Sequence, residues 1–116
     1  MSDKVHIPSA LAALTETWSQ RVVAEANGQL FKVAKGAGST RWHQHDDQDE
    51  LFIVYGGRLV IQLPERSVEL TSGDVFVVPK GVQHCPVAEP SAEFLIVGLN
   101  VTSNAAGGKP LPAEPA

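Results

Sequence analysis

The chain of 116 residues has little cysteine, no long apolar run and few positive charges. Cys85 is its single cysteine, so no intrachain disulfide can form, and we expect a reducing compartment, the cytoplasm. No apolar run approaches the ~20 residues that span a bilayer, and residues 1–6 lack the apolar segment of a secretory signal. Thirteen acidic against nine basic residues give a formal net charge of −4, which argues against nucleic acid or an anionic membrane surface as the main partner.

Helical patterns are also scarce. One weak helix is predicted over residues 9–20, where Leu11, Leu14 and Trp18 fall on one face. We expect this helix to act as a lid or brace. No segment matches the long crossover helix that joins parallel strands, so the strands should pair antiparallel.

The rest of the chain up to residue 101 consists of short apolar runs typical of strands. The predicted strands cover residues 21–25, 30–35, 40–45, 50–55, 59–63, 67–70, 75–78, 83–87 and 93–101. Turn signals such as Gly56-Gly57 and Pro90-Ser91 separate them. Many short strands at even spacing predict an all-β sandwich or small barrel.

This pattern divides the chain into three parts. Residues 1–20 form an N-terminal arm with the helix, and residues 21–101 form the strands. Residues 102–116 are rich in proline, alanine and glycine and offer almost nothing to bury. We therefore expect this tail to be an extended or disordered strap.

Two histidine-bearing segments carry the candidate chemistry. His43 and His45 stand two residues apart on a predicted strand, so their side chains point the same way. Glu50 follows five residues later, and His84 comes after a proline-glycine turn. Three neutral imidazoles and one carboxylate suit a divalent first-row transition metal. The residues do not choose among iron, manganese, zinc, nickel and copper, because cellular supply as well as affinity decides the metal.

These segments resemble the two motifs of the cupins, a family of jelly-roll barrels built as a double-stranded β-helix. The first motif is G-x5-H-x-H-x3,4-E-x6-G, and the residues that match it are His43, His45, Glu50 and Gly57. Its leading glycine stands one residue late, at Gly38. The second motif is G-x5-P-x-G-x2-H-x3-N, matched by Gly73, Pro79, Gly81 and His84, with Ala88 in place of the final asparagine.

The resemblance implies a cupin β-barrel in which His43, His45, Glu50 and His84 hold the metal. Asp49 is the rival carboxylate, because a shift of one residue in strand register would turn it inward in place of Glu50. The resemblance also implies a homodimer, since neighbouring cupin barrels commonly pack together. Apolar strands with large residues on both faces support this, because one barrel buries only one face of a strand.

Strand alternation predicts a ligand pocket beside the metal. Arg41 falls on the face of His43 and His45, while Phe52 and Val54 share the face of Glu50. Gln62 is a further candidate for the pocket. By contrast, Lys32 and Lys35 are predicted to face solvent, and Cys85 is predicted to be a buried small side chain that points away from the site.

Two classes of function fit these residues. The first is a metal-dependent enzyme, oxygenase-like rather than an isomerase or lyase, that acts on a small polar organic molecule. Four protein ligands leave two positions open on an octahedral ion for substrate, water or dioxygen. The second is a non-catalytic module that binds or senses a small molecule through a structural or ligand-anchoring metal. Few groups for proton transfer are predicted in the interior, which favours metal-only chemistry or binding over proton-shuttling isomerisation.

Overall fold

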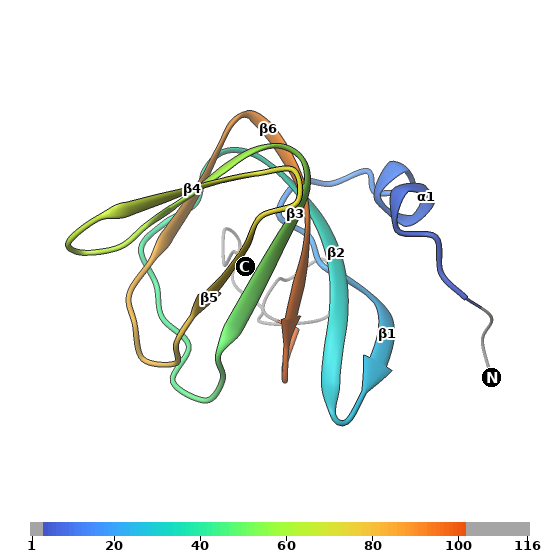
Figure 1. The fold of residues 1–116 in the computed structure, drawn as a ribbon, viewed down its shortest axis with the longest axis horizontal. Coiled ribbons are helices and arrows are strands. Elements are labelled where there is room, and N and C mark those ends of the chain that lie inside the picture. The colour runs from blue at the N-terminus through green and yellow to red at the C-terminus, as the bar shows by residue number, and fades with distance from the viewer. Residues whose placement is uncertain (1–3, 102–116) are drawn as a thin grey trace.

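The short apolar segments form six strands and one short helix in the computed structural model, which describes residues 4–101 (Figure 1). In chain order the elements are α1 (Ile7–Ala12), β1 (Arg21–Ala26), β2 (Gln29–Ser39), β3 (Glu50–Gln62), β4 (Ser67–Thr71), β5 (Val75–Val78) and β6 (Cys85–Gly98). The predicted all-β class with a short N-terminal helix is confirmed, whereas the predicted tail at residues 102–116 lies outside the described residues. No helix in the described part is long and apolar enough to cross a membrane.

The strands form one antiparallel sheet that curls around a shared interior. Their order is β1-β2-β6-β3-β4, and β5 pairs with the free side of β3 near its start. Figure 1 shows α1 lying outside this roll, next to β1 and β2. As the absence of crossover helices predicts, every strand pair in the described chain is antiparallel.

The longest ladder joins β3 and β6. It runs from Leu51 and Val97 at one end to Gln62 and Cys85 at the other, and two register shifts interrupt it near Gly57. A bulge adds a residue to one strand, bends that strand and increases its twist. The bulges therefore let two long strands curl round the interior as a continuous pair.

The prediction of a chain reversal at Gly56-Gly57 is wrong, because β3 continues through both glycines. Gly57 has a φ of +73°, and a Cβ there would overlap the carbonyl oxygen of Ser91 and lie 2.8 Å from the Cα of Ala92. Glycine is thus needed for the close approach of β6 as well as for the backbone angle. The predicted turn at Pro90-Ser91 likewise lies inside β6.

The inner faces of the strands form the main apolar core. Inward-facing residues are fully or almost fully buried, and they are Ala34, Phe52, Val54, Leu59, Ile61, Leu70, Val78, Ala88, Ala92, Phe94 and Ile96. Burying one large apolar side chain stabilises the fold by roughly 1.5–3 kcal/mol. Trp18 closes this core, with its ring centroid 5.9 Å from that of Phe94. Gly36 leaves room for the indole, since a Cβ there would lie 2.6 Å from it.

A second, smaller core lies between α1 and the outer face of the sheet. Leu11 and Leu14 pack against Val33 and Leu95 there, so the N-terminal segment is a brace, as predicted. The helix itself ends at Ala12 rather than at residue 20. Trp18, which was predicted to lie on the helix face, is outside the helix with a φ of +62°, and its indole packs against the barrel core.

The close approach at Gly57 leads to a stability prediction. Gly57→Ala should lower the free energy of unfolding by at least about 2 kcal/mol, because the new methyl group meets backbone atoms of β6 that cannot move aside. Urea unfolding monitored by circular dichroism measures this loss.

Gly28→Ala is the matched control, because Gly28 also has a positive φ, +78°, but has open space around its Cβ position. It should cost only about 1–2 kcal/mol, the penalty for the left-handed backbone alone. Equal losses in the two variants would contradict a packing role for Gly57.

Candidate metal centre

The fold gathers the four predicted ligand residues in one place. One ligand atom from each of His43, His45, Glu50 and His84 lies within 4.8 Å of the others. Glu50 begins β3 on the inward face, whereas His84 immediately precedes β6. The predicted strand at residues 40–45 is reduced to an isolated bridge, in which the backbones of His43 and His84 exchange hydrogen bonds of 3.0 and 2.8 Å.

Backbone carbonyl groups orient two of the imidazole rings. The Nδ1 of His43 lies 2.7 Å from the carbonyl oxygen of Arg41, and the Nδ1 of His84 lies 3.0 Å from that of Val82. A carbonyl oxygen only accepts hydrogen bonds, so each Nδ1 carries the proton and each Nε2 keeps its lone pair. This partner to the second ring nitrogen is the arrangement found behind histidine metal ligands.

The remaining polar atoms of the cluster fit a metal ion. The Nε2 of His45 and the Oε2 of Glu50 are buried and find no hydrogen-bond partner among the described residues, although they lie 3.4 Å apart. Leaving such atoms unsatisfied costs about 1–3 kcal/mol each. A divalent first-row metal bound by three imidazoles and a carboxylate would satisfy both, so the residues present fit that group.

The model of the cupin domain family matches residues 29–98. The chain belongs to the cupin family. It resembles a cupin-2 domain-containing protein from Shewanella frigidimarina, with 36% identity and a TM-score of 0.77 over 80% of this chain and 91% of that one. It also resembles protein NMB1881 from Neisseria meningitidis, with 25% identity and a TM-score of 0.76 over 84% of this chain and all of that one.

A curated relative of this cupin is the uncharacterized protein YdbB of Bacillus subtilis strain 168. The two are 36% identical over 63 residues, which are 53% of this chain and 56% of that protein. The match thus spans a little over half of the relative's length. Together with the jelly roll and the ligand cluster, these likenesses confirm the cupin fold predicted from the two motifs.

The electrostatics of the cupin site keep its ligands ready for a cation. Burial acts to raise the pKa of Glu50, but the neighbouring imidazoles of His45 and His84 outweigh it and lower that pKa to about 2. Burial lowers the pKa of His43, and the neighbouring imidazoles lower it further, against the opposing effects of the Arg41 carbonyl and Glu50. Both shifts favour the deprotonated forms that bind metal at neutral pH.

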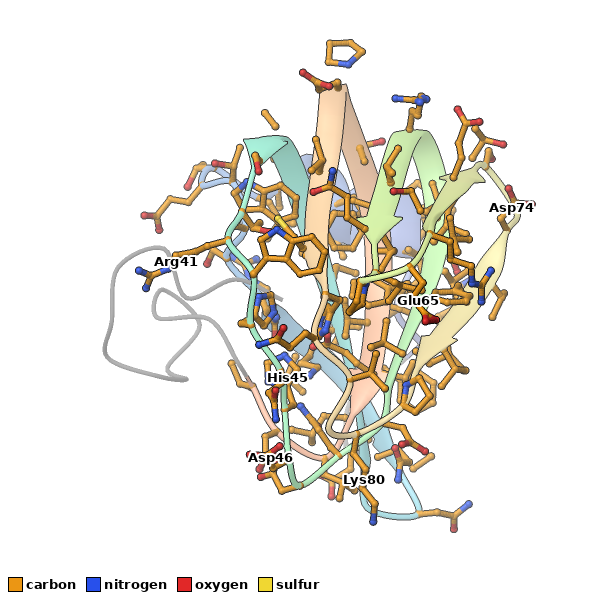
Figure 2. The ribbon with its side chains drawn as sticks, turned by 90° about the vertical axis from the view of Figure 1, so that its left-hand side faces the viewer. Arg41, His45, Asp46, Glu65, Asp74 and Lys80 are labelled. Carbon is orange, nitrogen blue, oxygen red and sulfur yellow. The ribbon has the colours of Figure 1, made fainter. Side chains whose placement is uncertain are left out.

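The rival carboxylate lies outside the cluster. Asp49 is exposed, and its Oδ1 accepts a hydrogen bond of 2.9 Å from the backbone N–H of Lys80. Figure 2 shows Lys80 and Asp46 at the same end of the molecule, on the two loops that carry the ligands. Asp49 thus joins those two loops, while Glu50 alone of the two carboxylates faces the imidazoles.

The predicted pocket residues are spread over different environments. Arg41 is exposed and extends outward at the edge of the molecule in Figure 2, away from His45. Phe52 and Val54 are packed in the apolar core. Gln62 is half-buried and follows the inward-facing Ile61, so alternation turns it away from the interior. A role for these four residues in substrate binding stays a prediction.

The sequence reasoning missed three buried polar residues, Gln20, Lys32 and Gln48. Lys32, predicted to face solvent, is fully buried inside the barrel, and Gln48 is 3% exposed. A signal was available for Lys32, because it stands in the apolar run Leu30–Ala34 of a strand buried on both faces. Nothing local marks Gln48, whose partners are the backbone N–H groups of residues 99 and 100.

The geometry predicts which carboxylate binds the metal. Glu50→Ala should weaken binding of the metal at least about tenfold. Removing a side chain that only hydrogen-bonds to a metal ligand already lowers metal affinity by about that factor, and Glu50 is itself a candidate ligand. Isothermal titration with zinc and elemental analysis of the purified protein measure the effect.

Asp49→Ala is the control, since it removes a carboxylate next to the site but leaves the ligand set intact. It should keep metal affinity within about threefold of the parent, the usual scatter of indirect effects on an interaction. A larger loss in Asp49→Ala than in Glu50→Ala would reverse the assignment.

Proposed function

We propose that this cupin holds one divalent transition metal ion, drawn from iron, manganese, zinc, nickel and copper, on His43, His45, Glu50 and His84. One observation carries the proposal: four ligand atoms converge within 4.8 Å, and two of them are buried without another hydrogen-bond partner. A chain that buried these atoms without a cation would leave their desolvation uncompensated.

We further propose that the protein is an enzyme that acts on a small polar organic molecule in an oxygenase-like reaction. An ion held by His43, His45, Glu50 and His84 would supply Lewis-acid polarisation and a place for substrate and dioxygen. The chain's own residues orient two of the imidazoles and keep Glu50 ionised, and the apolar core begins beside Glu50 at Phe52. Isomerisation is less well supported, because the buried amine of Lys32 is engaged by the carbonyl of Asn100.

A second candidate function is a binding or sensing module. The observation in its favour is that Phe52 and Val54 are 0% and 1% exposed, so they fill the interior next to Glu50. A ligand would then contact the metal from the rim rather than enter a deep cavity, and the ion would anchor it. The buried thiol of Cys85 suits the cytoplasm as the compartment for either function.

The open coordination positions lead to a test of the enzyme. On protein loaded with Fe(II), nitric oxide should give a new paramagnetic resonance signal, and turnover should follow in a screen of small acids, thiols and diols. His84→Ala should abolish both, because it removes a ligand while leaving the apolar core in place.

Gln83→Ala is the matched control, since Gln83 is the exposed neighbour of His84. It should retain the signal and the turnover. A signal without product over many turnovers would instead support the sensing module, and no signal on iron-loaded protein would contradict open positions.

We also propose a homodimer built on the outer face of β3 and β5. Tyr55, Val75 and Val77 lie there with 40%, 55% and 40% of their surface exposed. The brace formed by α1 covers Val33 and Leu95 instead. A row of exposed β-branched and aromatic residues on a sheet face is typical of an interface.

Light scattering at micromolar concentration should therefore give about twice the chain mass of 12.4 kDa. Val75→Glu should shift the protein to the monomer, because it would bury a carboxylate in the interface. Val22→Glu makes the same change on β1, where Val22 is 43% exposed, and should leave the dimer intact. A parent protein of monomer mass would rule out the dimer.

A further inference from the structure

Lys32 carries a buried positive charge in an apolar barrel. Its side chain is fully buried and lies on the inward face of β2, two residues before the core residue Ala34. In the sheet, Lys32 of β2 pairs with Ile96 of β6, and Ile96 pairs on its other side with Phe52 of β3. Burying an ammonium group costs several kcal/mol unless it is well compensated. Its hydrogen-bond partner is a neutral group, the backbone carbonyl of Asn100.

A network of hydrogen bonds holds that carbonyl in place. The Oε1 of Gln48 accepts hydrogen bonds from the N–H groups of Leu99 and Asn100, at 2.5 and 2.8 Å. The side-chain amide of Asn100 donates to Asp47 at 2.8 Å. Gly98 leaves room for this, since a Cβ there would lie 2.6 Å from the Oε1 of Gln48. The ammonium is thus anchored to the loop between two metal ligands.

The position of Lys32 matters for the charge of the site. Lys32 lies across β6 from Phe52, which is two residues from Glu50 on the same inward face of β3, so both charged groups face one interior. Burial lowers the pKa of Lys32, while the negative charge of Glu50 raises it. Among residues 4–101, Glu50 is the one buried carboxylate and Lys32 the one buried ammonium. The two charges of a divalent ion and the charge of Lys32 therefore exceed the single negative charge of Glu50.

An excess of positive charge in a dry interior favours one class of ligand. Charges interact more strongly there than in water, because the local dielectric is low. A bound anion would neutralise part of the excess, whereas a neutral ligand of similar size would not. We propose that Lys32 makes the open positions of the metal centre selective for anions, such as carboxylates and enolates, over neutral ligands. This rests on the proposed metal binding, because the open positions belong to the ion.

Protein loaded with Co(II) tests this, because the visible spectrum of cobalt reports ligand exchange. Azide is the anionic probe, and imidazole is the neutral probe at about pH 8, above its own pKa near 7. Lys32→Met keeps most of the length and an unbranched apolar stem but removes the charge. It should weaken azide binding by about tenfold, or about 1.4 kcal/mol, and change imidazole binding by less than about twofold.

Two further variants separate charge from structure. Lys35→Met makes the same change on the outer face of the same strand, where solvent screens the charge, and should leave both affinities unchanged. Lys32→Gln keeps a donor for the carbonyl of Asn100 and should behave as Lys32→Met does. It decides the outcome if Lys32→Met fails to fold.

The proposal is overturned if azide binding survives in both Lys32 variants, or if azide and imidazole affinities fall together, which would mark a structural role. A parent protein that binds no cobalt would instead refute the proposed metal centre, and a cobalt-loaded parent whose spectrum responds to neither probe would refute the open positions. Cobalt content and circular dichroism of each variant distinguish these results.

Discussion

Strands β3 and β6 pair along almost their whole length, and the site depends on how that pair curls. Gln62, at the end of β3, stands opposite Cys85, the residue after His84. Yet the Nε2 of His84 lies 3.2 Å from the Oε1 of Glu50, at the other end of β3. The ladder must therefore curl until both ends of one strand come together, and the bulges beside Gly57 allow this. A flat sheet would hold the same four ligands far apart.

The curled sheet encloses a core with two regions of different polarity. The larger part is filled by alternating apolar side chains, which supply the stability of the barrel. Beside this apolar part the structure also buries polar side chains, namely the ligands His45, Glu50 and His84 together with Lys32 and Gln48. Buried polar groups of this kind lower the stability of the fold unless each has its full set of hydrogen-bond or charge partners. A metal ion and an anionic ligand would supply the missing partners.

The features that depend on local spacing could be predicted from the sequence pattern. His43, His45, Glu50 and His84 occur at motif spacing, and the structure brings their ligand atoms together. The all-β class followed from short apolar runs, and the inward face of Glu50 and Phe52 followed from alternation along one strand. Each of these inferences needs only the chemistry and periodicity of neighbouring residues.

Other features depended on partners far away in the chain, and only the tertiary structure decided them. A glycine pair permits either a turn or a bulge, and the carbonyl of Ser91 against Gly57 makes it a bulge within β3. Trp18 leaves the predicted helix because the barrel offers its indole a place above Gly36. Lys32 is buried because Asn100, 68 residues later, brings a carbonyl to its ammonium. Local patterns state what a residue prefers, whereas long-range contacts choose between conformations and environments of similar free energy.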